Sequence, residues 1–318
     1  MNEFELIYSY FRDISPKRSD VLLGIGDDAA LLRVEPNHTL VVSTDSMVSG
    51  VHFLSQWPPA DIAWRAVMTA VSDLAAMGAT PCWMTLALTL PEVDCEWLAD
   101  FSRGIFTAIS ATEMALIGGD TTKGPLNIGV TVFGQVPFQQ EIKRSGARAG
   151  DSIFVSGYLG AAALALKNLK NNAIPEPDNT KIFSHLLHPY PRLDWIPLLR
   201  RYASAAIDIS DGLSADLNHL CVSSQVGARL EQEAIPLHPL LKKYAVAEAV
   251  DIALFGGDDY ELCFTVPATQ VQDFLAAVSL ANLHCFQVGT IIDGAGIQII
   301  DEQKNSKTLE PRGYQHFN

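Results

Sequence analysis

Two patterns of apolar residues alternate along this chain. One has the helical spacing of three or four residues, clearest where Trp64, Val67, Val71 and Leu74 form one stripe. The other is a short run of β-branched and aliphatic residues, typical of buried strands. The spacing predicts helices over residues 4–11, 58–77, 96–109, 192–202 and 271–281, and after residues 160 and 212. Strands are expected over residues 39–43, 83–90, 128–136, 153–156, 205–209, 262–266, 286–289 and 297–300, with a further strand ending at Ile117.

Strands and helices alternate irregularly in both halves, which predicts an α+β (α/β-type) fold with two domains. The 318 residues suffice for two cores. Residues 137–150 are polar and lack periodicity, so we place the boundary there. We expect an N-terminal domain of residues 1–143 with a mixed sheet, and a C-terminal α/β domain of residues 144–318. The hexapeptides 115–120 and 253–258 differ at one position, which favours two related halves.

Composition excludes several classes of protein. A chain with 48% hydrophobic and 18% charged residues is not of the disordered type. The net charge of −14 disfavours a nucleic-acid-binding surface. No apolar run approaches the roughly 20 residues that a membrane-spanning helix needs. The five cysteines are scattered and the first residues lack the pattern of a signal peptide, so we expect a cytoplasmic protein without disulfides.

Acidic residues recur beside glycine or other small residues. Asp27 and Asp28 follow Gly24 and Gly26, and the later examples are Thr44-Asp45, Ser72-Asp73, Gly118-Gly119-Asp120, Asp208-Ile209-Ser210-Asp211-Gly212 and Gly256-Gly257-Asp258-Asp259. Neighbouring carboxylates repel each other unless water or a cation neutralises them. Mg²⁺ typically binds a few carboxylates together with a nucleotide's phosphates. The pattern therefore predicts a magnesium–nucleotide site assembled from segments of both halves.

Gly24, Gly26 and Ala29 also satisfy the glycine pattern of dinucleotide-binding proteins. That motif presents backbone N–H groups and a helix N-terminus to a pyrophosphate. Asp27 and Asp28 would place two negative charges there, so we reject this interpretation. The chain contains neither a P-loop motif nor the protein-kinase signature set.

Each of these residues also has an ordinary structural interpretation. Gly-Gly-Asp turns are common in loops without function, and His52 after Gly50 is by default a loop histidine. Asp73 is either a solvated residue near a helix end or the partner of a cation. Arg144 is either a solvated charge in a linker or a bidentate ligand of a phosphate. The argument for a functional site depends on several such acids occurring near predicted strand ends.

Taken together, these motifs resemble the thiamine-monophosphate kinase family over nearly the whole chain. The motifs are Gly24-x-Gly26-Asp27-Asp28, Ser43-Thr44-Asp45, Gly50-x-His52-Phe53, Ser72-Asp73-Leu74-Ala75-Ala76-Met77-Gly78, Gly118-Gly119-Asp120-Thr121-Thr122, Arg144-Ser145-Gly146-Ala147, Asp208-x-Ser210-Asp211-Gly212-Leu213 and Gly256-Gly257-x-Asp259-Tyr260-Glu261-Leu262. The resemblance implies a homodimer in which N-terminal sheets pair into a β-barrel, with ATP in clefts between domains. It places the chain near aminoimidazole-ribonucleotide synthetase, selenophosphate synthetase and a hydrogenase maturation protein.

The resemblance also implies roles for individual residues. The metal positions are Asp28, Ser43, Thr44, Asp45, Asp73, Asp120, Asp208 and Asp211, of which Asp45, Asp73, Asp120 and Asp211 are the expected catalytic residues. Gly119, Asp120, Arg144 and Ser210 match ATP contacts, and His52 and Asp258 match substrate positions. Asp258 stands where relatives usually have glutamate, and Pro311 precedes Gly313-Tyr314 where some relatives carry an aromatic residue against the thiamine.

The implied reaction is ATP-dependent phosphorylation of thiamine monophosphate to thiamine diphosphate by direct in-line transfer, assisted by Mg²⁺. The acceptor phosphate has a second pKa of about 6, so it needs no strong general base near neutral pH. Two alternatives stay open. Another enzyme of the same superfamily is one, although selenophosphate synthetase has a reactive cysteine near its N-terminus and the first cysteine here is Cys82. The hydrogenase protein ends in a functional cysteine, whereas this chain ends His316-Phe317-Asn318. The second alternative is a non-catalytic magnesium–nucleotide-binding or metal-sensing module.

Overall fold

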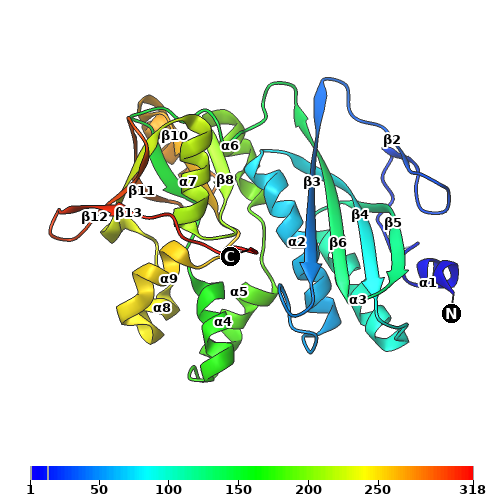
Figure 1. Ribbon diagram of the computed structural model, residues 1–318. Helices are drawn as coiled ribbons and strands as arrows, with labels where there is room; N and C mark the ends of the chain where they lie inside the picture. Colours follow the sequence, from blue (N-terminus) through cyan, green and yellow to red (C-terminus); the bar gives the residue numbers. More distant parts are fainter. Residues whose placement is uncertain (1, 13, 318) are drawn as a thin grey trace. The chain divides into compact units, whose positions relative to one another are not determined.

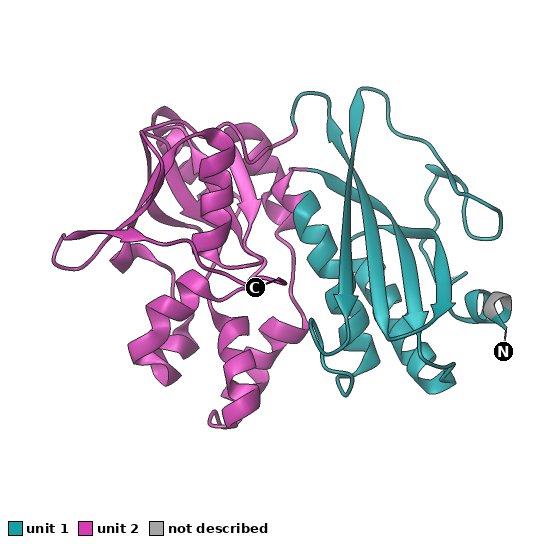
Figure 2. Cartoon of the chain, viewed as in Figure 1, with its two compact units in different colours: residues 1–74, 79–140 teal, residues 75–78, 141–318 magenta. Residues whose placement is uncertain are grey.

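The computed structural model describes residues 2–12 and 14–317, which form two compact units (Figure 2). Unit 1 comprises residues 1–74 and 79–140, and unit 2 comprises residues 75–78 and 141–318. The sequence placed the boundary between residues 143 and 144, close to this division. It did not anticipate that residues 75–78, where a unit 1 helix ends, belong with unit 2.

Unit 1 is built on a mixed four-stranded sheet with the order β3-β6-β4-β5 (Figure 1). The strands are β3 (His38–Val48), β4 (Thr80–Leu90), β5 (Ala115–Lys123) and β6 (Asn127–Pro137). The pair β4·β5 is parallel, and β6 pairs antiparallel with β3 and β4. The helices are α1 (Glu3–Tyr10), α2 (Pro59–Ala76) and α3 (Cys95–Ala111), and β1 (Val21–Leu23) pairs with β2 (Leu31–Leu32). The mixed N-terminal sheet predicted from the sequence is confirmed.

Helices α2 and α3 pack closely within unit 1. The residues of the predicted stripe on α2 that are fully buried include Val67, Val71 and Leu74. A Cβ at Gly104 of α3 would lie 2.3 Å from the backbone oxygen of Ala60, so only glycine permits this approach. The stripe is thus buried as its spacing predicts, and Gly104 allows α3 to approach the start of α2 closely.

Two predicted strands extend further than the sequence indicated. Strand β3 continues to Val48 and β5 continues to Lys123, so Asp45 and Asp120 lie inside strands instead of just after them. The extra residues are ordered by pairing with β6 and β4, a long-range effect that local propensity does not report. The hexapeptide 115–120 is a strand, whereas 253–258 ends a helix and enters a loop, so this sequence echo is not a structural repeat.

Unit 2 contains a seven-stranded sheet with the order β13-β12-β9-β11-β7-β10-β8. The strands are β7 (Ser152–Val155), β8 (Ala205–Asp208), β9 (Gly227–Glu231), β10 (Leu262–Val266), β11 (Phe286–Ile292), β12 (Gly296–Ile300) and β13 (Ser306–Leu309). Within the described part of this seven-stranded sheet, only the pair β12·β9 is parallel. The α+β class is thus confirmed, but the sheet is mostly antiparallel where the sequence suggested an α/β domain.

The helices of unit 2 cover both faces of this sheet. They are α4 (Ala161–Asn171), α5 (Asp178–Leu187), α6 (Ile196–Tyr202), α7 (Leu213–Ser224), α8 (Pro239–Tyr244), α9 (Ala249–Phe255) and α10 (Val271–Leu280), with short 3₁₀ turns at Leu193–Trp195, Gln232–Ala234, Val246–Glu248 and Ala268–Gln270. Ile153 and Val155 of β7 pack in one hydrophobic cluster, and Phe154 packs in another with Phe264 and Phe274. This alternation is the period-2 pattern of a strand buried on both sides.

Nothing among the helices of the described residues is both long and apolar enough to cross a membrane.

Candidate functional site

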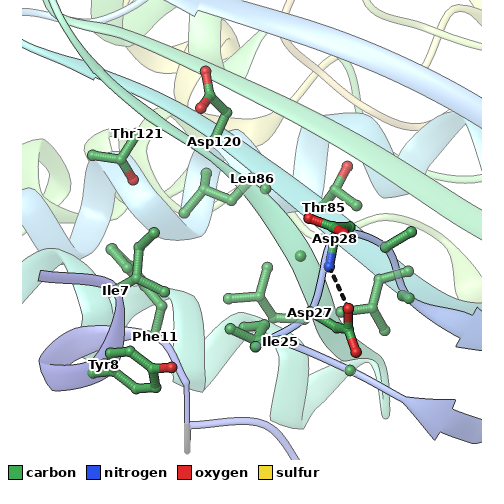
Figure 3. Close-up of a pocket in the computed structure, with 18 residues that line it drawn as sticks. Ile7, Tyr8, Phe11, Ile25, Asp27, Asp28, Thr85, Leu86, Asp120 and Thr121 are labelled. Carbon is green, nitrogen blue, oxygen red and sulfur yellow. Dashed lines mark hydrogen bonds between the residues drawn. The ribbon is translucent and has the colours of Figure 1, made fainter. Parts of the chain in front are cut away.

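A cavity of about 620 Å³ lies in unit 1 (Figure 3). Its walls come from the glycine-rich segment 24–30, from β4 at Thr85 and Leu86, from residues 116–121 of β5, and from α1. Ile7 and Tyr8 of α1, and Phe11 directly after it, contribute apolar side chains to the lining. The volume is within the usual range for small-molecule sites. The sequence did not indicate that α1 takes part.

Carboxylates from distant parts of the sequence line this cavity. Asp27 and Asp28 belong to the glycine-rich segment, and Asp120 projects from β5 (Figure 3). The backbone N–H of Asp28 donates to Oδ1 of Asp27 at 2.8 Å, so Asp27 is used in shaping the turn. Asp28 and Asp120 are both exposed. The structure therefore brings two predicted metal positions, Asp28 and Asp120, to one cavity.

Gly119 of β5 lies close to the backbone of β4. A Cβ there would lie 1.9 Å from the backbone oxygen of Leu86, far inside van der Waals contact. Apart from its chain neighbours, a Cβ at Gly118 would have no other atom within 4 Å. The close approach thus explains why Gly119 is glycine, independently of any ligand.

A second pair of carboxylates, Asp45 of β3 and Asp73 of α2, lies on the less exposed side of β3. Ser43, Asp45 and Met47 are less exposed than the alternating residues Thr44 and Ser46. Burial, and next the nearby negative charge of Asp73, raise the pKa of Asp45 to about 6.

Asp73 comes from α2 and accepts a 2.5 Å hydrogen bond from Oγ of Ser43. It is half-buried, and its closeness to Asp45 excludes the interpretation as a solvated surface aspartate. Two like charges near each other and partly removed from water are what a bound cation would stabilise.

One predicted residue of β3 lies apart from this pair. Thr44 points to the opposite side, where its Oγ1 lies 2.9 Å from Oγ1 of Thr131. Across the described residues, no group of three or more histidine, cysteine, aspartate or glutamate side chains is arranged to hold a metal ion. The structure thus shows Asp28 and Asp120 lining one cavity and Asp45 near Asp73, and the single cage expected from the sequence stays a prediction.

His52 lies in the turn that follows β3. The N–H of Val48 donates to its Nδ1 at 3.0 Å, and the N–H of His52 donates to the backbone oxygen of Val48 at 3.0 Å. Gly50 adopts a positive φ of 81°, and its N–H donates to the oxygen of the buried Phe53. Because Nδ1 accepts a hydrogen bond, the neutral ring carries its proton on Nε2. The backbone of this turn therefore fixes the ring of His52 through Nδ1.

Unit 2 gathers its predicted residues around the loop between β8 and α7. Asp208 is the buried last residue of β8, and Ser210, Asp211 and Gly212 lead into α7. The N–H of Asp258 donates to the oxygen of Ser210 at 2.8 Å, which joins this loop to the Gly-Gly-Asp-Asp segment.

The charges around Asp211 come from four segments. Burial raises the pKa of Asp211, while His219, His316 and Arg144 act to lower it and Asp258 acts to raise it. Asp211, Asp258 and Arg144 are therefore close enough to interact electrostatically. The structure brings together in unit 2 the residues that the sequence predicted from three separate motifs.

Three groups near this loop were not among the site residues predicted from the sequence. Asp216, in the first turn of α7, accepts hydrogen bonds from the loop's backbone, and burial raises its pKa to about 7. The sequence signal available for this role was that Asp216 follows Ser210 closely, by six residues. Tyr314 reaches the same loop, because its N–H donates to the oxygen of Asp211 at 3.2 Å. Glu261 is held by Arg192, whose Nε donates at 2.6 Å.

Comparison with known proteins finds family matches in both halves of the chain. Residues 26–136 match the AIR synthase related protein, N-terminal domain, and residues 148–302 match the AIR synthase related protein, C-terminal domain. The thiamine-monophosphate kinase of Salmonella typhimurium is 42% identical, covering 99% of this chain and 98% of that protein.

Solved structures agree with this result. The crystal structure of thiamine-monophosphate kinase from Stenotrophomonas maltophilia is 43% identical, covers 94% of this chain and 96% of that chain, and has a TM-score of 0.87. A structure of AaThiL complexed with AMPPCP and TMP is 32% identical, covers 100% of this chain and 99% of that chain, and has a TM-score of 0.80. With near-complete coverage at these identities, the chain belongs to the thiamine-monophosphate kinase family.

Proposed function

We propose that this protein transfers the γ-phosphoryl group of ATP to thiamine monophosphate, giving thiamine diphosphate and ADP. The observation that carries the proposal is family membership over the full chain, together with a relative complexed with AMPPCP and TMP. We read these two ligands as an ATP analogue and thiamine monophosphate. The alternative of a binding-only module has no observation in its favour.

The cavity of unit 1 is our candidate for the nucleotide. Its apolar lining from α1 suits a base, and Asp28, Gly119 and Asp120 also line it. Two carboxylates facing a polyphosphate would repel it unless cations intervene. This arrangement supports a metal–nucleotide complex as the bound species.

The donors in unit 1 fit Mg²⁺ by their chemistry. They are carboxylate and hydroxyl oxygens, the hard ligands that this ion prefers. We propose Asp28, Asp45, Asp73 and Asp120 as ligands, with Ser43 as a nearby hydroxyl. The raised pKa of Asp45 beside Asp73 supports a cation between that pair. Bound Mg²⁺ would neutralise the phosphates and stabilise the charge of the transition state.

Unit 2 supplies groups of both signs. We propose Asp208 and Asp211 as further metal ligands, and Ser210 and Arg144 as contacts of the nucleotide. The guanidinium of Arg144 is exposed and can bind a phosphate through two N–H groups. The backbone around Ser210 is held by hydrogen bonds, so Ser210 is already positioned before the nucleotide binds.

For the acceptor substrate we propose His52, Asp258 and Tyr314. The Nε2–H of His52 is a donor suited to a phosphate oxygen. Asp258 is held in a left-handed conformation with φ of 69° and accepts from the hydroxyl of Tyr260 at 3.1 Å. Tyr314 is exposed beside Asp211 and offers an aromatic face to a heteroaromatic ring.

The transfer needs positioning more than proton chemistry. A non-bridging oxygen of the thiamine phosphate attacks the γ-phosphorus, and the bond to the β–γ bridging oxygen breaks as ADP leaves. The attacking oxygen is already largely ionised near neutral pH. We therefore propose direct in-line transfer without a phosphoenzyme, and no side chain is assigned as a general base.

We also propose that the protein is a homodimer formed through unit 1. Strand β3 is an edge of its sheet and is long, with residues His38–Val48. Leu40, Val42 and Val48 on it are exposed. A long edge strand with exposed apolar side chains is a surface that soluble proteins usually cover. Pairing of two such sheets into a β-barrel would cover it.

The test is an assay of the purified protein with ATP, Mg²⁺ and thiamine monophosphate, followed by chromatographic separation of the products. We expect thiamine diphosphate and ADP in equal amounts, and no transfer of labelled phosphate to the protein. Nucleotide binding without any product would refute the kinase and leave the binding module. A label retained on the protein that chases into product would refute direct transfer.

A further inference from the structure

Asp216 binds three successive backbone amides. Its Oδ2 accepts from the N–H of Ser210 at 3.1 Å, of Asp211 at 3.0 Å and of Gly212 at 3.1 Å. The residue is buried, with 3% of its surface exposed. Because one oxygen holds all three N–H groups, the loop cannot change its backbone conformation without losing several hydrogen bonds in a buried place.

The carbonyl side of the same loop is held by other segments. The N–H of Asp258 donates to the oxygen of Ser210, and the N–H of Tyr314 donates to the oxygen of Asp211. A Cβ at Gly313 would lie 2.7 Å from that oxygen, so the C-terminal segment packs directly on the loop. Asp216 thus completes a set of contacts that fixes the backbone of residues 210–212 from both sides.

Ser224, the last residue of α7, does the same for another segment. Its Oγ accepts from the N–H of Gly146 at 3.1 Å and of Ala147 at 3.2 Å, and donates to the backbone oxygen of Arg144 at 2.8 Å. A serine hydroxyl offers one donor and two acceptor positions, and all are used here. The segment 144–147 therefore depends on this single hydroxyl.

We propose that α7 is the positioning element of the nucleotide-contacting part of unit 2. Asp216 at its start and Ser224 at its end are the positioning residues, acting through Ser210, Asp211 and Arg144. The inference rests on the proposed function, which assigns those three residues to ATP and metal. Neither Asp216 nor Ser224 is proposed to touch a substrate.

This role has a kinetic signature. A loop that is already ordered does not pay conformational entropy when ligand binds, whereas a loosened loop does. Loss of either contact should therefore weaken the use of MgATP. For Ser224→Ala the KM for thiamine monophosphate should change little, because Asp258 and Tyr314, which we assign to that substrate, are hydrogen-bonded to the 210–212 loop, whereas Ser224 holds residues 144–147.

The experiment compares three single variants and one double variant with two matched controls in the full-length protein. For Asp216→Ala we expect kcat/KM for MgATP to fall about tenfold or more, equal to about 1.4 kcal/mol. Asp216→Asn keeps a carbonyl oxygen that can accept the same N–H groups, so it should stay within about threefold of wild type. Ser224→Ala should lower kcat/KM for MgATP about threefold, and Asp216→Ala combined with Ser224→Ala should show both losses.

The controls remove similar groups elsewhere in unit 2. Asp301→Ala deletes a buried carboxylate that accepts from the N–H of Gln303 at 3.0 Å and of Asn305 at 2.9 Å, between β12 and β13. Ser223→Ala removes an exposed hydroxyl next to Ser224. Both should leave the MgATP kinetics unchanged, even where Asp301→Ala lowers thermal stability.

Several outcomes would overturn the inference. Wild-type MgATP kinetics in Asp216→Ala and Ser224→Ala is one, and an equal loss in Asp301→Ala is another. If Asp216→Ala does not fold, Ser224→Ala alone decides, and its full activity counts against the proposal. Calorimetric titration with AMPPCP and Mg²⁺ measures nucleotide binding independently of the reaction. If the wild type makes no product in the activity assay, phosphotransfer is refuted. Weaker AMPPCP binding by the variants would still support positioning by α7.

Discussion

Replacing Asp45 by asparagine should stabilise the metal-free protein while abolishing its activity. Burial and the charge of Asp73 raise the pKa of Asp45 from 3.8 to about 6. In the folded state the ionised carboxyl is therefore penalised relative to the unfolded chain. Each pKa unit corresponds to about 1.4 kcal/mol, so the penalty reaches about 3 kcal/mol once the group is ionised in both states.

The pH dependence has a defined sign. Because the folded-state pKa is the higher one, stability from this group is fully present below about pH 4 and is lost as the pH rises through about 6. Asp45→Asn has no such group. Its advantage over wild type should thus be absent at pH 4 and largest at pH 7 and above.

The assay is thermal unfolding with EDTA at several pH values, followed by the same series with Mg²⁺. For a unit of this size, 3 kcal/mol corresponds to a rise in Tm on the order of 10 °C. Added Mg²⁺ should stabilise wild type and not the variant. Asp120→Asn is the control, since Asp120 is exposed and should give no gain without metal. A lower Tm for Asp45→Asn at pH 7.5 in EDTA, or an unchanged pH profile, would refute the reasoning.

Three further changes test other parts of the structure. His52→Ala removes a donor held by the backbone, so KM for thiamine monophosphate should rise about tenfold; a change confined to KM for MgATP would contradict that role. Gly119→Ala forces a Cβ against the backbone of β4 and should cost about 2 kcal/mol in urea unfolding, whereas Gly118→Ala, with open space, should not. Arg192→Met leaves the carboxylate of Glu261 buried without its partner and should cost about 3 kcal/mol, and a loss below about 1 kcal/mol would show that the pair is solvated.

Local sequence patterns were enough to predict most of the elements. The apolar stripe on α2 and the β-branched runs of β7, β8 and β10 report burial that each segment carries in its own periodicity. The sequence also predicted that scattered aspartates near glycines mark the chemistry. Those side chains are costly to bury without a partner, so their presence beside apolar runs was informative by itself.

The arrangement of these aspartates was decided by tertiary structure. Asp45 meets Asp73 because β3 and α2 pack together, and Asp28 shares a cavity with Asp120 because the 24–30 segment lies against β5. Neither pairing has a signal in local sequence. The length of β3 and β5, and the mostly antiparallel order of the sheet in unit 2, also depend on strand partners far away in the chain.

The sequence by itself thus determined which residue types are available: hard oxygen ligands, an arginine, a histidine and the elements that carry them. Only the folded structure decided which of them act together and which backbone groups hold them, as Asp216 does for residues 210–212. The physical reason is that burial is encoded locally by periodicity, whereas proximity between charges depends on contacts between segments distant in the sequence.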